Sequence, residues 1–505
     1  MKDRRLLLLL VIAVSCCLWL SGRAEAEDRA GRPINVLLIT ADDMNCDSVG
    51  AYGCKVPETT PNIDRLAAQG MRFAHAHVTI AVCQPCRGVW ATGRYPHRSG
   101  IEGFQRMTAD HPTLMQTLQD AGYRTGILGK VGHSTPKTSF QWDMHHDMGE
   151  LGKGRDPRRY YAYAKGFFEK SKTSNKPFYL MANSHDPHRP FAGSDQEAAM
   201  RRRGKLVDPS RIYRDEEVDV PGFLPDIPKV RKEIAEYFSS VRRCDDTVGA
   251  LLKALDESGL KQNTLVMFLS DHGMALPFAK TNCYLHSTRT PWIVRWPGVV
   301  EAGRVDGRHF VSGVDLMPTL LDAAGVRLPE GMDGRSFVPI LNGKQQEGRE
   351  FVFTQFHQTA ARRRYPMRCI QTKQYGYIFN PWADGKRVFL NESQSGRSFS
   401  AMKEAAKTDR AIAARVKLFQ YRVVEEFYDF EKDPDATRNL IGDPACRSAV
   451  DRLHGELARW MQATGDPALE AFRGRESPAS LGKFMSEQDG KARPKRPKRK
   501  KRTKK

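Results

Sequence analysis

The chain has 505 residues, of which 40% are hydrophobic and 28% are charged. This balance is ordinary for a globular protein and excludes a collagen, a coiled coil and a fully disordered chain. The formal net charge of +21 is concentrated at the C-terminus, because residues 491–505 hold eleven Lys or Arg and no acidic residue, which leaves +10 on the other 490 residues.

The N-terminus has the pattern of a secretory signal. Three basic residues precede an apolar run over residues 6–20, and Ala24-Glu25-Ala26 offers a small-x-small cleavage site. We therefore expect residues 1–26 to be removed and the mature protein to be secreted or periplasmic. A lipoprotein anchored at Cys16 is the alternative. No later stretch reaches the roughly 18 apolar residues of a spanning helix, so we expect no transmembrane span.

Short apolar runs alternate with helical patterns through the first two-thirds of the chain. An apolar run of strand length is typical of a strand buried on both faces of a parallel sheet. The expected strands cover residues 34–40, 124–128, 178–182 and 265–269, and the expected helices cover residues 61–70, 111–122 and 233–255. This alternation predicts an α/β fold with a large, mostly parallel sheet that helices cover on both faces.

The pattern changes after about residue 341. Short strands at 351–353, 375–379 and 427–430 and a helix at 446–461 predict a smaller α+β subdomain. We expect a main domain over residues 27–345, this C-terminal subdomain over residues 346–475, and a disordered basic tail over residues 476–505. The tail is interpreted as a solvated extension. An anionic polysaccharide is an alternative ligand for it, and no nucleic-acid partner is expected.

Polar residues gather where the predicted strands end, and ligands of open α/β sheets bind at that edge. Asp42 and Asp43 follow the first strand, and Asp271 follows the strand at 265–269. Carboxylates that meet at such an edge indicate a hard cation with oxygen ligands, Ca²⁺ or Mg²⁺. The alternative is that these acids lie in solvated loops.

A C-x-x-C pair, Cys83 and Cys86, is open to interpretation as a redox or zinc site. The segment Cys83-Gln84-Pro85-Cys86-Arg87-Gly88, followed by Thr92-Gly93-Arg94, resembles the sulfatase signature C-x-P-x-R with T-G-R. The resemblance implies that Cys83 is oxidised to formylglycine, and that Arg87 holds the aldehyde hydrate and the sulfate. Cys86 stands where the family usually has Ser or Ala, which leaves open an oxidised Cys83–Cys86 pair that would block this maturation.

Further segments resemble sulfatase motifs in the same order, and together they imply an alkaline-phosphatase-like fold. The implied metal ligands are Asp42, Asp43, Cys83, Asp271 and His272, with His272 where many members have Asn. The implied catalytic residues are Cys83, Arg87, Lys130, His133, His188 and Lys280. The spacing of Lys130 and His133 differs in part of the family.

Within the family, the chain looks most like the sulfamidase-like subgroup. The shared segments are His185-Asp186-Pro187-His188-Arg189, Thr281-Asn282, Tyr365-Pro366-Met367-Arg368, Tyr428-Asp429 and Asn439-Leu440. This likeness implies substrate contacts by His185, Arg189, His357 and Arg368, the last two reaching over the cleft from the second subdomain. Arg189 either binds a substrate carboxylate or pairs with an acid of the protein.

The function implied by the resemblance is hydrolysis of sulfate esters or N-sulfates on a sulfated saccharide. A hydroxyl of the hydrated formylglycine attacks sulfur, His188 or Lys280 protonates the leaving atom, and His133 takes a proton to expel sulfate. The implied partners are the saccharide and a formylglycine-generating maturation enzyme. The alternatives are a phosphate or phosphonate monoester hydrolase of the same superfamily and a non-catalytic glycan-binding relative.

Overall fold

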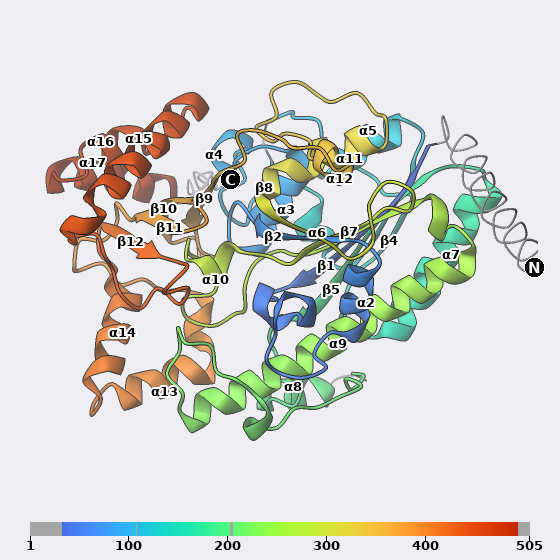
Figure 1. Ribbon diagram of the computed structural model, residues 1–505. Helices are drawn as coiled ribbons and strands as arrows, with labels where there is room; N and C mark the ends of the chain where they lie inside the picture. Colours follow the sequence, from blue (N-terminus) through green and yellow to red (C-terminus); the bar gives the residue numbers. More distant parts are fainter. Residues whose placement is uncertain (1–32, 108, 203–205, 493–505) are drawn as a thin grey trace, which may run out of the picture.

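A computed structural model describes residues 33–107, 109–202 and 206–492 of the chain. The predicted signal over residues 1–26 and the end of the predicted tail lie outside these residues. Figure 1 shows a large sheet with helices above and below it, and a smaller lobe to one side that holds the C-terminal elements.

The main sheet has eight strands in the order β4-β3-β5-β1-β6-β7-β2-β8. Their bounds are β1 (Asn35–Asp42), β2 (Met71–His77), β3 (Arg124–Leu128), β4 (Met144–His146), β5 (Phe178–Pro187), β6 (Thr264–Ser270), β7 (Trp292–Arg295) and β8 (Arg304–Ser312). Every pairing is parallel except the two that β7 makes with β6 and β2. All eight residues of β1 are buried, as a central strand covered on both faces requires. The predicted α/β fold is confirmed.

Helices cover both faces of this sheet (Figure 1). One face carries α2 (Pro61–Ala68), α7 (Pro157–Thr173) and α9 (Pro228–Ser258), and the other carries α3 (Cys83–Thr92), α5 (Leu114–Asp120) and α11 (Leu316–Ala323). Shorter helices are α4 (Pro96–Ser99), α6 (Val131–Ser134), α8 (Asp195–Arg201), α10 (Leu285–Thr288) and α12 (Val338–Leu341). Helix α9 begins five residues before the predicted start, because Pro228 is suited to the first turn of a helix.

The smaller lobe is built on an antiparallel sheet of order β12-β11-β10-β9. Its strands are β9 (Val352–Gln358), β10 (Arg364–Gln371), β11 (Tyr375–Phe379) and β12 (Glu425–Asp429). The helices around it are α13 (Arg397–Ala405), α14 (Arg410–Tyr421), α15 (Arg447–Thr464), α16 (Leu469–Arg473) and α17 (Pro478–Ala492). Strand β10 was not predicted, because its proline and two arginines interrupt an apolar alternation.

The prediction of disorder from residue 476 is wrong for residues 478–492, which form α17. Leu481, Phe484 and Met485 are buried at helical spacing, which the high content of Gly, Ser and Lys obscured. The helix is also tied down by polar contacts, since Arg364 Nε donates to Oε1 of Gln488 at 3.0 Å. Among the described residues, no helix combines the length and apolarity that crossing a bilayer requires.

Candidate active site

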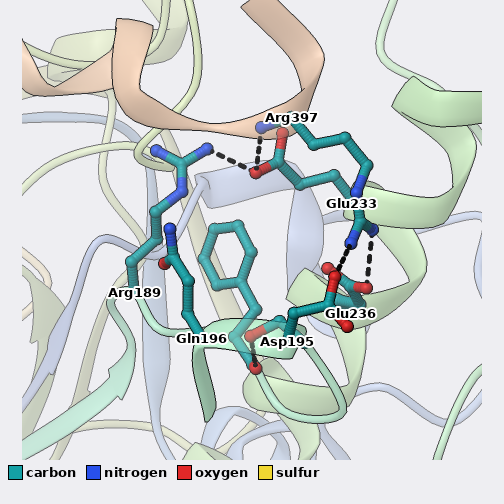
Figure 2. A pocket seen from close by; sticks show the side chains of 8 residues that line it. Arg189, Asp195, Gln196, Glu233, Glu236 and Arg397 are labelled. Carbon is teal, nitrogen blue, oxygen red and sulfur yellow. Dashed lines mark hydrogen bonds and ion pairs between the residues drawn. The ribbon is translucent and has the colours of Figure 1, made fainter. Parts of the chain in front are cut away.

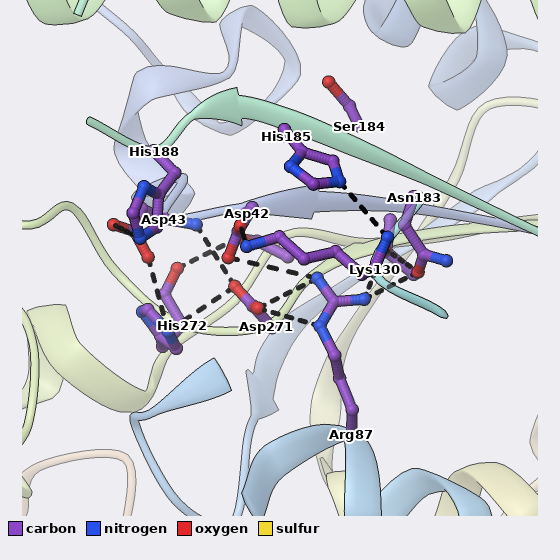
Figure 3. A network of polar contacts seen from close by, with 12 residues as sticks. Asp42, Asp43, Arg87, Lys130, Asn183, Ser184, His185, His188, Asp271 and His272 are labelled. Atoms are coloured by element: carbon purple, nitrogen blue, oxygen red, sulfur yellow. Dashed lines mark hydrogen bonds and ion pairs between the residues drawn. The ribbon is translucent and has the colours of Figure 1, made fainter. Parts of the chain in front are cut away.

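The carboxyl ends of four adjacent parallel strands, β3, β5, β1 and β6, form one edge of the main sheet. Figure 3 shows the side chains that follow these ends pointing toward one another. These side chains belong to residues that are far apart in the sequence. They meet because parallel strands have their carboxyl ends at the same edge of the sheet. Asp42 ends β1, Asp271 follows β6, Lys130 follows β3, and His185 and His188 lie at the end of β5.

Cys83 begins α3, and Arg87 lies one helical turn later on the same face. The Cys83 side chain is buried, with only 3% of the residue exposed. Burial raises the pKa of its thiol well above the ordinary value, and the charges of Asp42 and Asp271 raise it further against the opposing effect of Lys280. An unmodified Cys83 would therefore be a protonated thiol, which is a weak nucleophile.

Arg87 is fixed by four hydrogen bonds from its buried guanidinium (Figure 3). Nε and Nη2 donate to Oδ2 of Asp271 at 3.2 and 2.9 Å. Nη1 donates to Oγ1 of Thr40 at 3.2 Å and to Oδ1 of Asn183 at 2.6 Å. Thr40 and Asn183 were not predicted as part of the site. They are ordinary polar residues inside strands, and only the pairing of β1 with β5 places them together.

Lys130 occupies a left-handed backbone position, with φ of 52°, directly after Gly129. Gly129 also has a positive φ, of 69°, and a Cβ there would lie 2.4 Å from the carbonyl oxygen of Asn183, so only glycine fits. This tight turn directs the Lys130 ammonium to Asp42, with which it forms an ion pair. The backbone N–H of Lys130 donates to Nε2 of His185 at 3.1 Å. His185 therefore holds the Lys130 turn in place rather than offering Nε2 to a substrate.

Lys280 is a fully buried cation between two carboxylates. Its Nζ donates to Oδ1 and Oδ2 of Asp43 at 2.8 and 2.9 Å and forms a second ion pair with Glu392. Burial would lower the pKa of Lys280, but the charges of Asp43 and Glu392 outweigh it and hold that pKa well above its ordinary value. Glu392 belongs to the smaller lobe, and no feature of its sequence indicated that it would reach the site.

The predicted metal ligands lie together. One ligand atom each from Asp42, Cys83, Asp271 and His272 lies within 4.8 Å of the others, and Asp43, Cys83 and His188 form a second such group. Cys86 belongs to neither group, so the described residues give no support to a zinc site at the C-x-x-C pair.

His272 provides a test of whether these residues fit a cation. Its Nδ1 lies 3.0 Å from the carbonyl oxygen of Gly273, so Nδ1 carries the proton and Nε2 carries a lone pair. Nε2 lies 3.4 Å from Oδ1 of Asp43 and 3.6 Å from Oδ1 of Asp271, and it is buried without a hydrogen-bond partner among the described residues. A lone pair facing two carboxylate oxygens needs a positive charge between them, so the donor set fits a divalent cation.

The pKa values of two carboxylates of the site, Asp42 and Asp271, are shifted in opposite directions. Burial would raise the pKa of Asp42, but Lys130, His188 and Arg87 outweigh it and hold that pKa well below the ordinary value. Burial and the neighbouring charge of Asp42 raise the pKa of Asp271. Asp42 is therefore the firmly ionised member of the pair, and a bound cation would stabilise the negative charge on both.

Two further histidines lie around this cluster. His188 donates from Nδ1 to the carbonyl oxygen of Arg189 at 2.6 Å, which leaves Nε2 facing Oδ2 of Asp43 at 4.0 Å. His133 is in α6, and burial, with the charge of Lys130, lowers its pKa to about 4. At neutral pH the His133 ring is therefore uncharged and able to accept a proton.

Arg189 pairs with an acid of the protein, which is the second of the two predicted roles. Its Nη2 donates to Oε1 of Glu233 at 2.8 Å, and Figure 2 shows this pair on the wall of a pocket between α8, α9 and α13. Glu233 also accepts from the backbone N–H of Arg397 at 3.1 Å. Arg189 thus joins the end of β5 to α9 and, through Glu233, to α13.

His357 and Arg368 already have partners within the protein, and their predicted contacts with the substrate stay a prediction. Both residues are buried inside the smaller lobe, each with 1% exposed. Arg368 donates from Nε and Nη2 to the carboxylate of Asp466. His357 lies against Gln355 and Glu102. Arg368 thus joins β10 to the residues after α15, and His357 joins β9 to Glu102, which follows α4.

Comparison with known proteins places these features in a family. The sequence matches the sulfatase family model over residues 34–326 and the model of the N-sulphoglucosamine sulphohydrolase C-terminal domain over residues 271–388. N-sulphoglucosamine sulphohydrolase from Homo sapiens is 29% identical over 483 residues, covering 86% of this chain and 91% of its own length. An ulvan-active sulfatase from Formosa agariphila is 27% identical over 467 residues, covering 90% of this chain and 86% of its own.

A solved structure described as a 2-O GAG sulfatase superposes with a TM-score of 0.63 at 20% identity, covering 88% of this chain and 94% of its own. This likeness confirms the fold. The sulfatase family model spans more than half of the chain, from β1 to the residues after α11. The chain therefore belongs to the sulfatase family and is a hydrolase of sulfuric esters or sulfamates.

Proposed function

We propose that this enzyme releases inorganic sulfate from a sulfated glycan, with Cys83 converted to formylglycine and a divalent cation, Ca²⁺ or Mg²⁺, held by Asp42, Asp43, Asp271 and His272. The observation that carries the proposal is the position of Cys83 Sγ, which lies within 4.8 Å of ligand atoms of Asp42, Asp271 and His272. A formylglycine at this position supplies the nucleophile, and the cation supplies positive charge beside it.

Other side chains of the site would bind the sulfate group and transfer protons. Arg87 and Lys280, which are buried, and Lys130, whose side chain is 9% exposed, are the cations that bind the sulfonyl oxygens and stabilise the charge that develops on them. His188, whose Nδ1 is held by the Arg189 carbonyl, delivers a proton from Nε2 to the departing oxygen or nitrogen. His133, neutral at pH 7, accepts the proton that is lost when sulfate leaves.

An N-sulfated glucosamine is the proposed substrate group. The match to the C-terminal domain model of N-sulphoglucosamine sulphohydrolase supports it, because that match includes Lys280 and the strands β9, β10 and β11 of the smaller lobe. An O-sulfated saccharide is the second candidate, supported by the similarity to the ulvan-active sulfatase. A phosphate or phosphonate monoesterase and a glycan-binding protein without the aldehyde remain the alternatives that the experiment below tests.

We further propose that residues 1–26 direct the protein to the outside of the cytoplasm, where it is secreted or periplasmic. The catalytic domain would span residues 27–345 and the C-terminal subdomain would begin at residue 346, between the last strand of the main sheet and the first strand of the small sheet. A formylglycine-generating enzyme is the partner that maturation of Cys83 requires.

The test is to express the chain with a formylglycine-generating enzyme and to identify the residue at position 83 by peptide mass spectrometry. Sulfate release is then measured with N-sulfoglucosamine, an O-sulfated glucosamine and an aryl phosphate. We expect an aldehyde at position 83 and sulfate release that Cys83→Ala abolishes, whereas Cys86→Ala retains it. A thiol in protein that releases sulfate, or full activity of Cys83→Ala, would overturn the mechanism. Release of phosphate alone would favour the phosphoesterase.

A further inference from the structure

His188, the proposed proton donor, is oriented by a hydrogen bond to the backbone. Its side chain is 31% exposed, so packing does not by itself fix the direction of the ring. Nδ1 donates to the carbonyl oxygen of Arg189 at 2.6 Å, whereas Nε2 lies 4.0 Å from Oδ2 of Asp43, beyond hydrogen-bond distance. The direction in which Nε2 points therefore depends on the position of the Arg189 carbonyl group.

Arg189 is in turn held by its side chain. Nη2 donates to Oε1 of Glu233 at 2.8 Å, Nη1 donates to the carbonyl oxygen of Ala275, and Cζ lies 5.0 Å from the centroid of the Phe191 ring. The Arg189 side chain is only 11% exposed, and a charge in such a place is costly unless an opposite charge lies beside it. Glu233 supplies that charge, since it forms an ion pair with Arg189.

Glu233 is a fixed carboxylate, because the smaller lobe also binds it. Its Oε1 accepts from the backbone N–H of Arg397 at 3.1 Å, and its Oε2 accepts from the backbone N–H of Ser398 at 2.6 Å. These two N–H groups open α13, where the helix itself offers them no acceptor. Burial would raise the pKa of Glu233, but the charge of Arg189 and the hydrogen bonds from Ser398 outweigh it and lower that pKa.

The ion pair of Arg189 with Glu233 has no spare room on the side of the smaller lobe. A Cβ at Gly396 would lie 2.6 Å from Oε1 of Glu233 and closer still to Nη2 of Arg189, so a side chain there would push the two apart. The other side is open, because Arg189 lines the pocket of about 210 Å³ in Figure 2 together with Glu236 and Asp195. Without the charge of Glu233, the guanidinium has both space and other carboxylates to turn toward.

We propose that Glu233 is a positioning residue of the active site, which sets the direction of Nε2 of His188 by holding Arg189 in place. Glu233 acts without touching the reacting atoms, because its effect passes through the Arg189 carbonyl group. The inference rests on the proposed function, in which His188 protonates the leaving atom. It adds a residue that lies in none of the sequence motifs, and it makes proton donation depend on the first turn of α13.

The test compares Glu233→Gln with Glu236→Gln. Glu236 lies one turn further along α9, its side chain is 11% exposed against 5% for Glu233, and it pairs with the side chain of Arg397. Of these two described residues, only Glu233 pairs with Arg189. Gly396→Ala is a second variant, which keeps the charge of Glu233 but separates it from Arg189. The φ of −86° at Gly396 is accessible to alanine, so this substitution does not strain the backbone.

Two substrates with different leaving groups are used as probes. One is the sulfated glucosamine that the unsubstituted enzyme hydrolyses, whose amine or alkoxide needs a proton when it leaves. The other is 4-nitrophenyl sulfate, whose phenolate leaves without one. The quantity measured is the kcat/KM of the first substrate relative to that of the second. Loss of folded or matured protein lowers both values equally, so a purely structural defect does not change this ratio.

We expect Glu233→Gln and Gly396→Ala to lower the ratio by about 10- to 100-fold, because a misplaced proton donor loses much of its catalytic effect. Glu236→Gln should keep the ratio of the unsubstituted enzyme. An unchanged ratio in Glu233→Gln would overturn the inference, even if both rates fell together.

Crystal structures distinguish this result from a failure of the proposed function, because they need no turnover. Cys83→Ala protein is compared with the same protein carrying Glu233→Gln. We expect the 2.6 Å hydrogen bond between His188 and the Arg189 carbonyl group to be lost in the second protein. If it is lost while the unsubstituted protein releases no sulfate, the positioning role stands and the catalytic proposal falls. If it persists, Glu233 does not position His188, whatever the activity.

Discussion

Arg87 and Asp271 form a buried ion pair in which Nε and Nη2 of the arginine share one carboxylate oxygen, Oδ2, at 3.2 and 2.9 Å. Both side chains are completely buried. The other oxygen of this carboxylate, Oδ1, lies 3.6 Å from Nε2 of His272. Asp271 therefore orients Arg87 through one oxygen and belongs to the group of possible metal ligands through the other. Through this carboxylate, the position of Arg87 and the geometry of the proposed metal site depend on each other.

This coupling predicts the behaviour of Arg87 variants. Arg87→Lys keeps the charge but loses the fork that contacts Asp271, Thr40 and Asn183, and we expect kcat/KM to fall by about 10²- to 10³-fold. Arg87→Met leaves Asp271 buried without its partner, and we expect the free energy of unfolding to drop by about 3–5 kcal/mol. Steady-state sulfate release and urea denaturation measure the two effects. Unchanged kcat/KM in Arg87→Lys would show that the fork does not act on the substrate.

Removal of the cation should destabilise the protein. Three buried carboxylates, those of Asp42, Asp43 and Asp271, surround the cluster, and their mutual repulsion is relieved when a divalent ion binds. At an ion concentration of 100 times Kd, binding to the native state stabilises it by about 2.7 kcal/mol. We therefore expect the Tm to fall on chelation and to recover with Ca²⁺ or Mg²⁺. Asp42→Asn is the control, and its Tm should respond much less; an identical response would place the ion elsewhere.

The pKa of His133 gives a pH prediction. Burial and Lys130 lower it from the ordinary value of 6.5 to about 4 in the folded protein. The unfolded chain takes up this proton at higher pH than the folded chain, so the contribution of His133 to stability is complete above pH 6.5 and is lost as the pH falls toward 4. NMR of ¹³C-labelled histidine, assigned with His133→Gln, should show a neutral ring at pH 5.5. A midpoint near 6.5 would contradict this prediction.

Asp186, between His185 and His188, should be essential for stability. Its carboxylate accepts from Nε of Arg155 at 2.8 Å and from Nε and Nη2 of Arg243 at 2.7 and 3.0 Å, all in the interior. Asp186→Asn leaves two buried guanidinium groups short of negative charge, and we expect a loss of about 3–5 kcal/mol in urea denaturation.

The matched control for Asp186 is Asp195→Asn. Asp195 also pairs with an arginine, Arg397, but its side chain is 98% exposed, so the pair is screened by water. Its free energy of unfolding should equal that of the unsubstituted protein within error. A comparable loss in the two variants would mean that burial does not set the strength of these pairs.

The core of the fold was predictable because central strands of a parallel sheet are apolar on both faces. The runs at 34–40 and 265–269 stand out for this reason, and they place Asp42 and Asp271 at one edge. Strand β10 escaped prediction since it carries charges into the interior, where Arg368 meets Asp466. The prediction for Arg368 rested on likeness to the sulfamidase-like subgroup, and such a likeness gives no information about the pairing of Arg368 with the distant Asp466.

Glu392 shows the other limit of prediction. Its short helix, residues 392–395, is polar and has no motif, and its importance arises only because the smaller lobe packs against Lys280. Asn183 is similar, since its role depends on the pairing of β5 with β1 rather than on its neighbours in the chain. Residues that act through a motif or a strand end were found, and residues that act through tertiary packing were not.

The ion pair between Glu392 and Lys280 also determines when, during synthesis of the chain, the region around Cys83 can close. Cys83 and Lys280 are synthesised before residue 392, so the ion pair of Lys280 with Glu392 can form only after the start of the smaller lobe has been made. In the complete protein that thiol is only 3% exposed. The proposed maturation enzyme would therefore reach Cys83 more easily before the C-terminal lobe is in place than after it.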